Sequence, residues 1–436
     1  MIYSIIVFIL TCLLLILAIL KKPSIKISKF HIETFLLVSL IGALLIIIPG
    51  IIPFSYVIDN IFANSPINPI KILIILISMA MLSITLDEMG FFNYIAIKSI
   101  DLVKGSQYKL FFILYSLIAT WTIFTSNDIV ILTFTLFICY FAKEAKINPI
   151  PYLVMEFVTA NTYSMLFIIG NPTNIYLATK SNISFFSYFQ TMLLPTIIAG
   201  LTSLVILLLL FHKQLKQKFE DVKIKQIELH SKPITIITIV HLLAATILLA
   251  ISSYINLDMW IIALFALLSL TTILIFYSVI TKSNTVLKRV YLRLPYNLVI
   301  FVLSMFTLVL ALKYYNVFSY INSFLSSLAT NKLNTILVYG LSSALCDNII
   351  NNIPMSLAYS SLLELVSKNQ NSAIYATIIS SNIGAYLTPI GALAGIMWMN
   401  ILKEQNSKYS FVDFVKYGVL VTPLVLLSAL LVLFLI

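Results

Sequence analysis

The sequence carries little charge for its length. Asp, Glu, Lys and Arg make up 10% of its 436 residues, whereas hydrophobic residues make up 61%. A soluble domain carries about 25% charged residues, and no water-soluble core of this size needs so much apolar material. The composition therefore excludes an ordinary soluble protein and predicts an all-α, polytopic protein that is embedded in a lipid bilayer.

Other features that the sequence lacks exclude several classes of protein. The chain has three cysteines, Cys12, Cys139 and Cys346, and an odd number in apolar surroundings argues against a disulfide framework. It has no GxxxxGK[ST] motif, so any coupling to ATP needs a separate ATPase subunit. The net charge of +11 does not indicate nucleic acid, because the lysines cluster in short loops, as they do in proteins oriented in a membrane.

Long apolar runs predict the membrane crossings. The first run, 2–20, is followed directly by KKPSIKISK without a small-residue cleavage site, so we interpret it as a span rather than a signal peptide. As a helix, each long run is long enough, or nearly so, to cross a hydrocarbon core about 30 Å thick. Ten crossings are expected, at 2–20, 34–53, 70–86, 149–179, 187–211, 233–254, 258–280, 296–313, 371–400 and 416–435.

Loop charge predicts the orientation. Loops 54–69 and 255–257 contain neither Lys nor Arg, whereas four other loops are rich in them: 21–32, 212–232, 281–295 and 401–416. Placing the basic loops in the cytoplasm makes 212–232 a cytoplasmic linker. It also puts the N- and C-termini on the extracytoplasmic side of what is expected to be a bacterial plasma membrane.

Two segments, 108–142 and 333–367, have a different design. Each consists of two short apolar arms around a polar middle, SND at 126–128 and DNIINNIP at 347–354. We expect both segments to be re-entrant hairpins. Each is followed by a long span that is broken near its centre, 149–179 at GNPTN and 371–400 at LTPIG.

The order of these segments is the same in the two halves of the chain, 1–211 and 233–436. Each half has three spans, a hairpin, a broken span and a closing span. Because five crossings per half put the second half on the opposite side, the pattern predicts two inverted repeats. Such repeats are typical of secondary transporters with a substrate site near the midplane.

We expect the hairpin tips and the helix breaks to form the substrate-binding site. A backbone that is interrupted inside the membrane has free polar groups, so it must line a cavity or be buried in protein. The spans and hairpins that hold them contain no Lys or Arg over 110–142, 147–179, 333–367 and 369–402. Helix ends and amide donors would therefore hold the solute. The predicted substrate-binding residues are Ser126, Asn127, Asn171, Thr173, Asn174, Asn351, Asn352, Thr388 and Gly391.

Two carboxyl groups lie near the hairpin tips, Asp128 and Asp347. Intramembrane carboxyl groups mark proton or ion pathways, so we expect these two to couple transport to H⁺ or Na⁺, with Na⁺ near Asn127, Asn174 and Asn352. No resident metal or other cofactor is expected. A third group, Glu156, follows Lys146 by ten residues, and we interpret it as interfacial.

Five strings in order resemble bacterial arsenite permeases of the ion transporter superfamily. They are SITLDEMGFFNYIAIKSIDLVKG, SND, ANTYSMLFIIGNPTNI, NNIP and YLTPIGALAGIMWMNIL, and they cover 83–402. That superfamily also contains divalent-anion and citrate symporters and some Na⁺/H⁺ antiporters. The resemblance implies an elevator-type transporter rather than an enzyme, and a homodimer.

The leading hypothesis is a permease that exchanges a small inorganic solute, arsenite or antimonite, for protons. Arsenite at neutral pH is mostly uncharged As(OH)₃, which suits a site of amides and hydroxyls, with Asp128 as the proton carrier. A Na⁺-coupled symporter of organic acids or oxyanions is the second hypothesis. A Na⁺/H⁺ antiporter that uses Asp128 and Asp347 is the third, and a channel or scaffold is the least favoured.

Overall fold

The computed structural model describes residues 1–21, 24–27, 30–63, 68–100, 103, 105–219, 228–405, 407 and 409–436. Lys22, Lys29, Lys408 and residues 220–227 of the predicted linker lie outside the described residues. The described residues confirm the all-helical fold class, with one small exception. A two-stranded antiparallel ribbon, β1 (Ser24–Ile27) and β2 (Phe30–Glu33), leads into the second helix.

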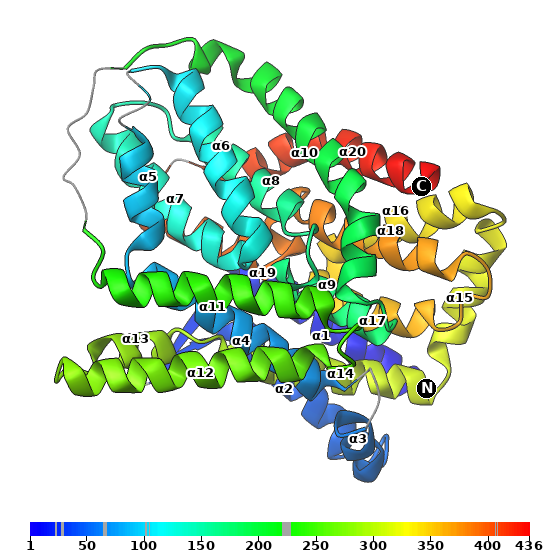
Figure 1. Cartoon of the computed structure of the whole chain (residues 1–436). Helices are drawn as coiled ribbons and strands as arrows, with labels where there is room; N and C mark the ends of the chain where they lie inside the picture. Colours follow the sequence, from blue (N-terminus) through cyan, green and yellow to red (C-terminus); the bar gives the residue numbers. More distant parts are fainter. Residues whose placement is uncertain are drawn as a thin grey trace.

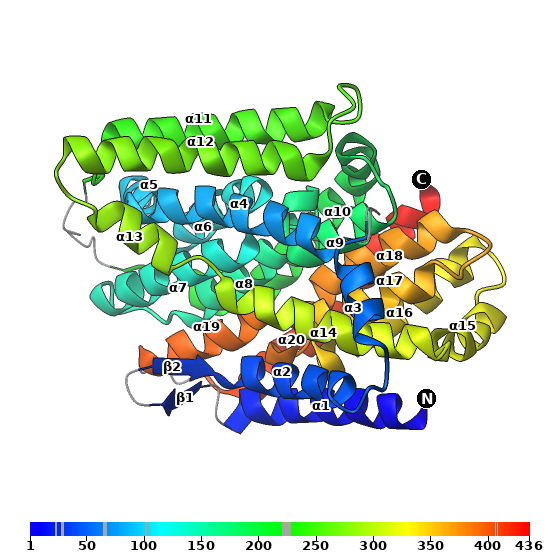
Figure 2. The ribbon, with the colours of Figure 1, turned by 90° about the horizontal axis from the view of Figure 1, so that it is seen from below.

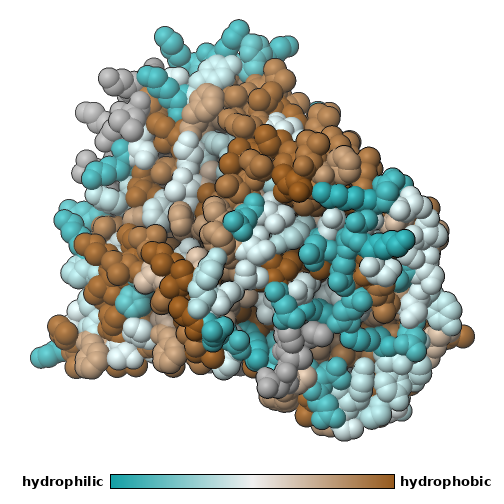
Figure 3. Space-filling model, turned by 45° about the vertical axis from the view of Figure 1, so that its right-hand side comes forward, coloured by the Kyte–Doolittle hydropathy of each residue, from teal (hydrophilic) through white to brown (hydrophobic). Residues whose placement is uncertain are grey.

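Eight helical segments of the described chain are long and apolar enough to cross a membrane. Apolar side chains such as Leu209 (74% exposed) and Val279 (70% exposed) point outward from them, and Figure 3 shows broad hydrophobic areas on the surface. Lipid covers such surfaces in a membrane protein. The eight are α4 (Pro69–Glu88), α6 (Gln107–Phe124), α10 (Phe185–Leu215), α11 (Lys232–Ile251), α12 (Met259–Ile280), α13 with α14 (Thr285–Tyr314), α16 (Lys332–Ile350) and α20 (Phe411–Leu435).

The apolar helices α1 (Ile2–Lys21) and α2 (Thr34–Ile47) complete the predicted unbroken spans, and the count of ten crossings stays a prediction. Four predicted loop regions contain short helices that the apolar pattern does not show. They are α3 (Phe54–Ile61), α5 (Phe91–Ile100), α13 (Thr285–Leu292) and α15 (Val317–Leu328).

Both predicted hairpins are present. Hairpin 1 consists of α6 and α7 (Asn127–Glu144), and hairpin 2 consists of α16 and α17 (Asn352–Leu363). Their tips are only one or two residues long. At the tip of hairpin 2 the backbone of Asn351 has a φ of 73°, a positive value that Asn tolerates better than most residues do. The first arms, at 18 and 19 residues, are longer than the sequence pattern indicates.

Both predicted helix breaks are also present. The first lies between α8 (Ile150–Tyr163) and α9 (Pro172–Lys180), and the second between α18 (Gln370–Ile383) and α19 (Leu393–Glu404). Pro172 is the first residue of α9, which follows the first break, and Pro389 is the first residue of a 3₁₀ turn (Pro389–Gly391) inside the second break. At such positions proline's missing N–H costs no hydrogen bond. The first break starts at Ser164, earlier than GNPTN, and includes a single turn of 3₁₀-helix, Ile168–Gly170.

The helices of the two halves pack in one recurring pattern. In hairpin 1, α6 packs on α8 and α7 packs on α19, and in hairpin 2, α16 packs on α18 and α17 packs on α9. Helices α10 and α20 lie side by side (Figure 1). Figure 2 shows α1 and α2 at one edge of the molecule and α11 and α12 at the opposite edge, with the hairpins and broken helices between them. The division into inverted repeats at 1–211 and 233–436 stays a prediction.

The first break tolerates no side chain at Gly170. A Cβ at this position would overlap the backbone carbonyl of Ser164, so Gly170→Ala must displace the 3₁₀ turn. We expect this substitution to destabilise the protein by about 1–3 kcal/mol, measured as a lower thermal melting temperature in detergent. Val279→Ala, on an exposed face of α12, should leave the melting temperature unchanged. Equal melting temperatures for the two variants would contradict this account of the break.

Candidate functional site

A cavity of about 670 Å³ reaches the tip of hairpin 1. Its walls come from α4, the hairpin tip, the first break, α19 and the segment 292–298 that leads into α14 (Tyr296–Tyr314). Two of the predicted site residues, Ser126 and Asp128, line this cavity, and of GNPTN only Pro172 does. The remaining polar or charged lining residues are Glu33, Arg293, Tyr296, Asn297 and Asn400.

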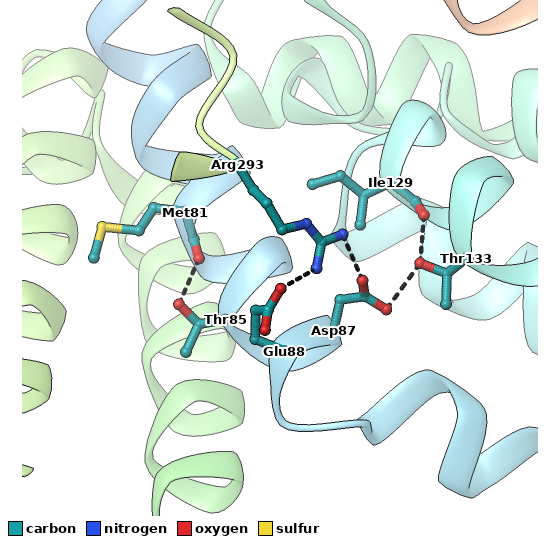
Figure 4. A network of polar contacts seen from close by, with 7 residues as sticks. All are labelled: Met81, Thr85, Asp87, Glu88, Ile129, Thr133 and Arg293. Carbon is teal, nitrogen blue, oxygen red and sulfur yellow. Dashed lines mark hydrogen bonds and ion pairs between the residues drawn. The ribbon is translucent and has the colours of Figure 1, made fainter. Parts of the chain in front are cut away.

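The positive charge in the cavity wall is already paired. Among the described lining residues Arg293 is the one Lys or Arg, and its two terminal nitrogens contact Asp87 Oδ2 and Glu88 Oε1, each at 2.6 Å. Thr133 Oγ1 of α7 lies 2.9 Å from Asp87 Oδ1 and 2.8 Å from the carbonyl oxygen of Ile129. Figure 4 shows how this network joins the end of α4 to hairpin 1.

The carboxyl groups of the cavity have no such cation. Glu33 Oε2 accepts a hydrogen bond from Asn297 Nδ2 at 3.2 Å. Burial raises the pKa of the Glu33 carboxyl above its ordinary value, and the hydrogen bond from Asn297 opposes part of that shift. Neither Glu33 nor Asp128 belongs to an ion pair among the described residues. The described part of the wall therefore offers carboxyl, amide and hydroxyl groups, but no free cation.

The polar residues of GNPTN do not line the cavity. Their side chains form hydrogen bonds with other side chains of the protein. Asn171 Nδ2 donates to Asn382 Oδ1 at 3.0 Å, and Asn382 Nδ2 donates to Asn174 Oδ1 at 2.7 Å. Thr173 and Ser381 share a hydrogen bond between their hydroxyl groups, at 3.0 Å. Asn171, Thr173 and Asn174 are at most 1% exposed. The end of α18 thus holds the first break in place.

Asn127, at the tip of hairpin 1, is also buried. Its Nδ2 donates to Asn161 Oδ1 of α8 at 2.9 Å, whereas its Oδ1 has no hydrogen-bond donor among the described residues. One acceptor therefore remains free next to Asp128, the carboxyl group that lines the cavity.

The second break and the tip of hairpin 2 form a separate cluster. Thr388 Oγ1 donates to Asn348 Oδ1 at 2.7 Å, and Asn351 Nδ2 donates to the carbonyl of Ile390 at 2.9 Å. A Cβ at Gly391 would come within 3.0 Å of Asn348 Oδ1, so glycine permits this close approach. Asn352 is buried as well. None of these residues lines the 670 Å³ cavity.

The Asp347 carboxyl group lies near the second break and has no hydrogen-bond donor among the described residues. It is fully buried on α16, and neither carboxyl oxygen has a donor among the described residues. A Cβ at Gly384 would lie 2.8 Å from its Oδ2, so the carboxyl group faces the second break. A buried carboxylate without a partner is costly, which favours a neutral acid or a bound cation at this position.

The sequence interpretation missed or misread four residues. Asn382, Asn161 and Asn348 were not predicted, although an Asn precedes each break in the strings ANTYS and SSNIG. The interpretation of Glu156 as interfacial is wrong, because its side chain is fully buried between helices. Glu156 lies six residues beyond the first residue of α8, Ile150, or about 9 Å of helix rise, at a point where α7 and α19 pack against it.

The sequence matches a known protein family over most of its length. Residues 15–373 match the family described as "Citrate transporter". The chain belongs to this family of membrane transporters. This membership confirms the predicted class of transporter rather than enzyme.

Curated relatives confirm the resemblance to arsenite permeases. The chain is 26% identical to the arsenical pump membrane protein of Escherichia coli (strain K12) over 384 residues, which cover 86% of each chain. It is 25% identical to the arsenical pump membrane protein of Yersinia enterocolitica over 357 residues, which cover 79% of this chain and 82% of the relative.

A solved structure supports the fold. The YdaH transporter of Alcanivorax borkumensis superposes with a TM-score of 0.60 and 13% sequence identity, over 99% of this chain and 98% of that chain. At this identity the likeness concerns the fold alone.

The position of Asn382 leads to a stability prediction. Asn382→Ala leaves the buried Asn171 Nδ2 and Asn174 Oδ1 without their partners, and each such orphan costs about 1–3 kcal/mol. We expect a clearly lower melting temperature of the purified protein. Asn284→Ala, at an exposed residue whose side chain caps nothing, is the control. A melting temperature for Asn382→Ala equal to that of the control would show that the first break does not depend on α18.

Proposed function

We propose that this transporter moves an uncharged inorganic oxo-species, arsenite or antimonite, across the bacterial plasma membrane in exchange for protons. One observation carries the proposal. The cavity at hairpin 1 contains two carboxyl groups, Asp128 and Glu33, that form no ion pair with any described residue, while Arg293, the single cation of its described lining, is neutralised by Asp87 and Glu88. Such a wall repels polyanions and suits a neutral solute.

The chemistry of the solute fits the same wall. As(OH)₃ offers hydroxyl groups that donate and accept hydrogen bonds, which Ser126, Asn297 and Asn400 can exchange with it. A tricarboxylate such as citrate would need free Arg or Lys side chains, or several open helix N-termini. The names of the curated relatives, arsenical pump membrane proteins, agree with the neutral solute.

Asp128 is the proposed proton carrier, since it lines the cavity and follows directly after the hairpin tip. Its protonation would remove a charge from the cavity, and its ionisation would restore it. Glu33, Arg293 and Asn400 belong to, or directly border, segments predicted to face the cytoplasm, so the cavity would be open to that side. We further propose that the two halves act as inverted repeats, that both termini are extracytoplasmic and that the transporter forms a homodimer.

A Na⁺-coupled carrier is the second candidate. Two groups of unpaired acceptors support it, Asn127 Oδ1 and the Asp347 carboxyl group, because oxygen acceptors without donors are what a hard cation needs. Of the two other residues expected near Na⁺, Asn174 already accepts a hydrogen bond from Asn382, and Asn352 is buried. Sodium dependence of transport distinguishes this candidate from the first.

Transport by everted membrane vesicles tests the proposal. Arsenite uptake should follow an imposed proton gradient, and Asp128→Asn should lower gradient-driven uptake at least tenfold, because the amide cannot release a proton. Asp413→Asn, in the exposed capping box of α20, is the matched control and should retain uptake. Gradient-driven arsenite uptake that survives Asp128→Asn would exclude Asp128 as the carrier. Sodium-driven citrate uptake without arsenite uptake would establish the second candidate.

A further inference from the structure

Glu156 lies in the middle of α8 and touches two other helices. Its Oε1 lies 2.9 Å from Thr135 Oγ1 on α7, and its Oε2 lies 3.4 Å from Trp398 Nε1 on α19. The side chain is fully buried. One carboxyl group therefore connects hairpin 1, the first broken helix and the second broken helix, at a point outside the 670 Å³ cavity.

The hydrogens at this point can be counted. Thr135 has one hydroxyl hydrogen, and its Oγ1 lies 2.5 Å from the carbonyl oxygen of Ile131, four residues earlier. Threonine in a helix commonly donates to that carbonyl, and a hydrogen committed there is not available to Glu156. The 2.9 Å contact with Glu156 Oε1 then needs a hydrogen from the carboxyl group itself. Trp398 Nε1, which can only donate, supplies the hydrogen bond to Oε2.

The charges around Glu156 point the same way. Glu156 takes part in none of the ion pairs found between described residues. The Cys139 thiol on α7 is close enough to interact with it electrostatically. The Tyr152 hydroxyl group, on the same helix as Glu156, donates its hydrogen bond to Gln107 Oε1. Beyond Trp398 the neighbours are the rings of Phe157, Phe414 and Tyr409. An ionised carboxylate here would have no counter-charge among the described residues, whereas a neutral carboxyl group has both of its contacts satisfied.

We propose that Glu156 is a proton-binding site, distinct from Asp128 and Asp347, whose bound proton holds α7, α8 and α19 together. When the proton leaves, the O–H bond at Oε1 breaks and the proton passes to water. A buried carboxylate then remains to which, among the described residues, Trp398 alone still donates a hydrogen bond. The contact between the three helices is then present at low pH and is lost as rising pH removes the proton. This site does not depend on which solute the transporter carries.

Infrared spectroscopy of the purified full-length protein tests the site directly. A buried protonated carboxyl group gives a carbonyl stretching band that shifts in D₂O. The spectrum of the native protein minus that of Glu156→Gln should contain such a band, and the difference should vanish at high pH. Asp347→Asn is the control for the other buried carboxyl group and should keep the Glu156 band. No band in the native-minus-Glu156→Gln difference at any pH would show that Glu156 is ionised, and would overturn the proposal.

Thermal stability across pH is the second measurement. The amide of Glu156→Gln donates to Thr135 and accepts from Trp398 without titrating, so this variant should melt at the native temperature at low pH and at a higher temperature than the native protein at high pH. Thr135→Val removes the acceptor and should melt lower than the native protein at low pH. Parallel melting curves of native protein and Glu156→Gln at every pH would refute a proton that leaves this site.

Discussion

Two helices that are predicted to lie in the membrane are interrupted, and polar side chains from other elements hold each interruption in place. Lipid offers no hydrogen bonds, so the first break depends on Asn382 and Ser381 at the end of α18. The second break depends on Asn348 and on Asn351 at the tip of hairpin 2. Each break is therefore stabilised by an element other than the helix that it interrupts, and the first by the opposite half of the chain.

The residues that stabilise the two breaks are therefore different from the residues that line the cavity. Most of the polar residues around the breaks are used up by protein contacts, and the cavity wall is left with Ser126, Asp128 and a few residues from segments at the ends of α2, α14 and α19. Arg293 is held by Asp87 and Glu88. We therefore propose that the charge balance of the wall, more than the amide groups of the breaks, selects the solute.

The sequence predicted the parts whose signal is local. Polar tips between short apolar arms revealed both hairpins, and Pro172 and Pro389 revealed both breaks, because proline interrupts a helix wherever it falls. It did not predict which Asn bonds to which, since Asn382 and Asn174 are 208 residues apart and meet only after folding. Asn171, Thr173 and Asn174 were expected to face the solute, and here they face Asn382 and Ser381, so their role as solute ligands stays a prediction. Glu156 was misread because its burial comes from α7 and α19, which pack against it only after folding.

The central claim is that the cavity accepts an uncharged oxo-species. Arsenite exchange by the purified transporter in proteoliposomes, measured as the external pH rises through the ionisation of arsenous acid, tests it most directly. The account predicts that the exchange rate follows the concentration of As(OH)₃ and that excess citrate does not compete. An exchange rate that follows the ionised species, or that citrate suppresses, would contradict it.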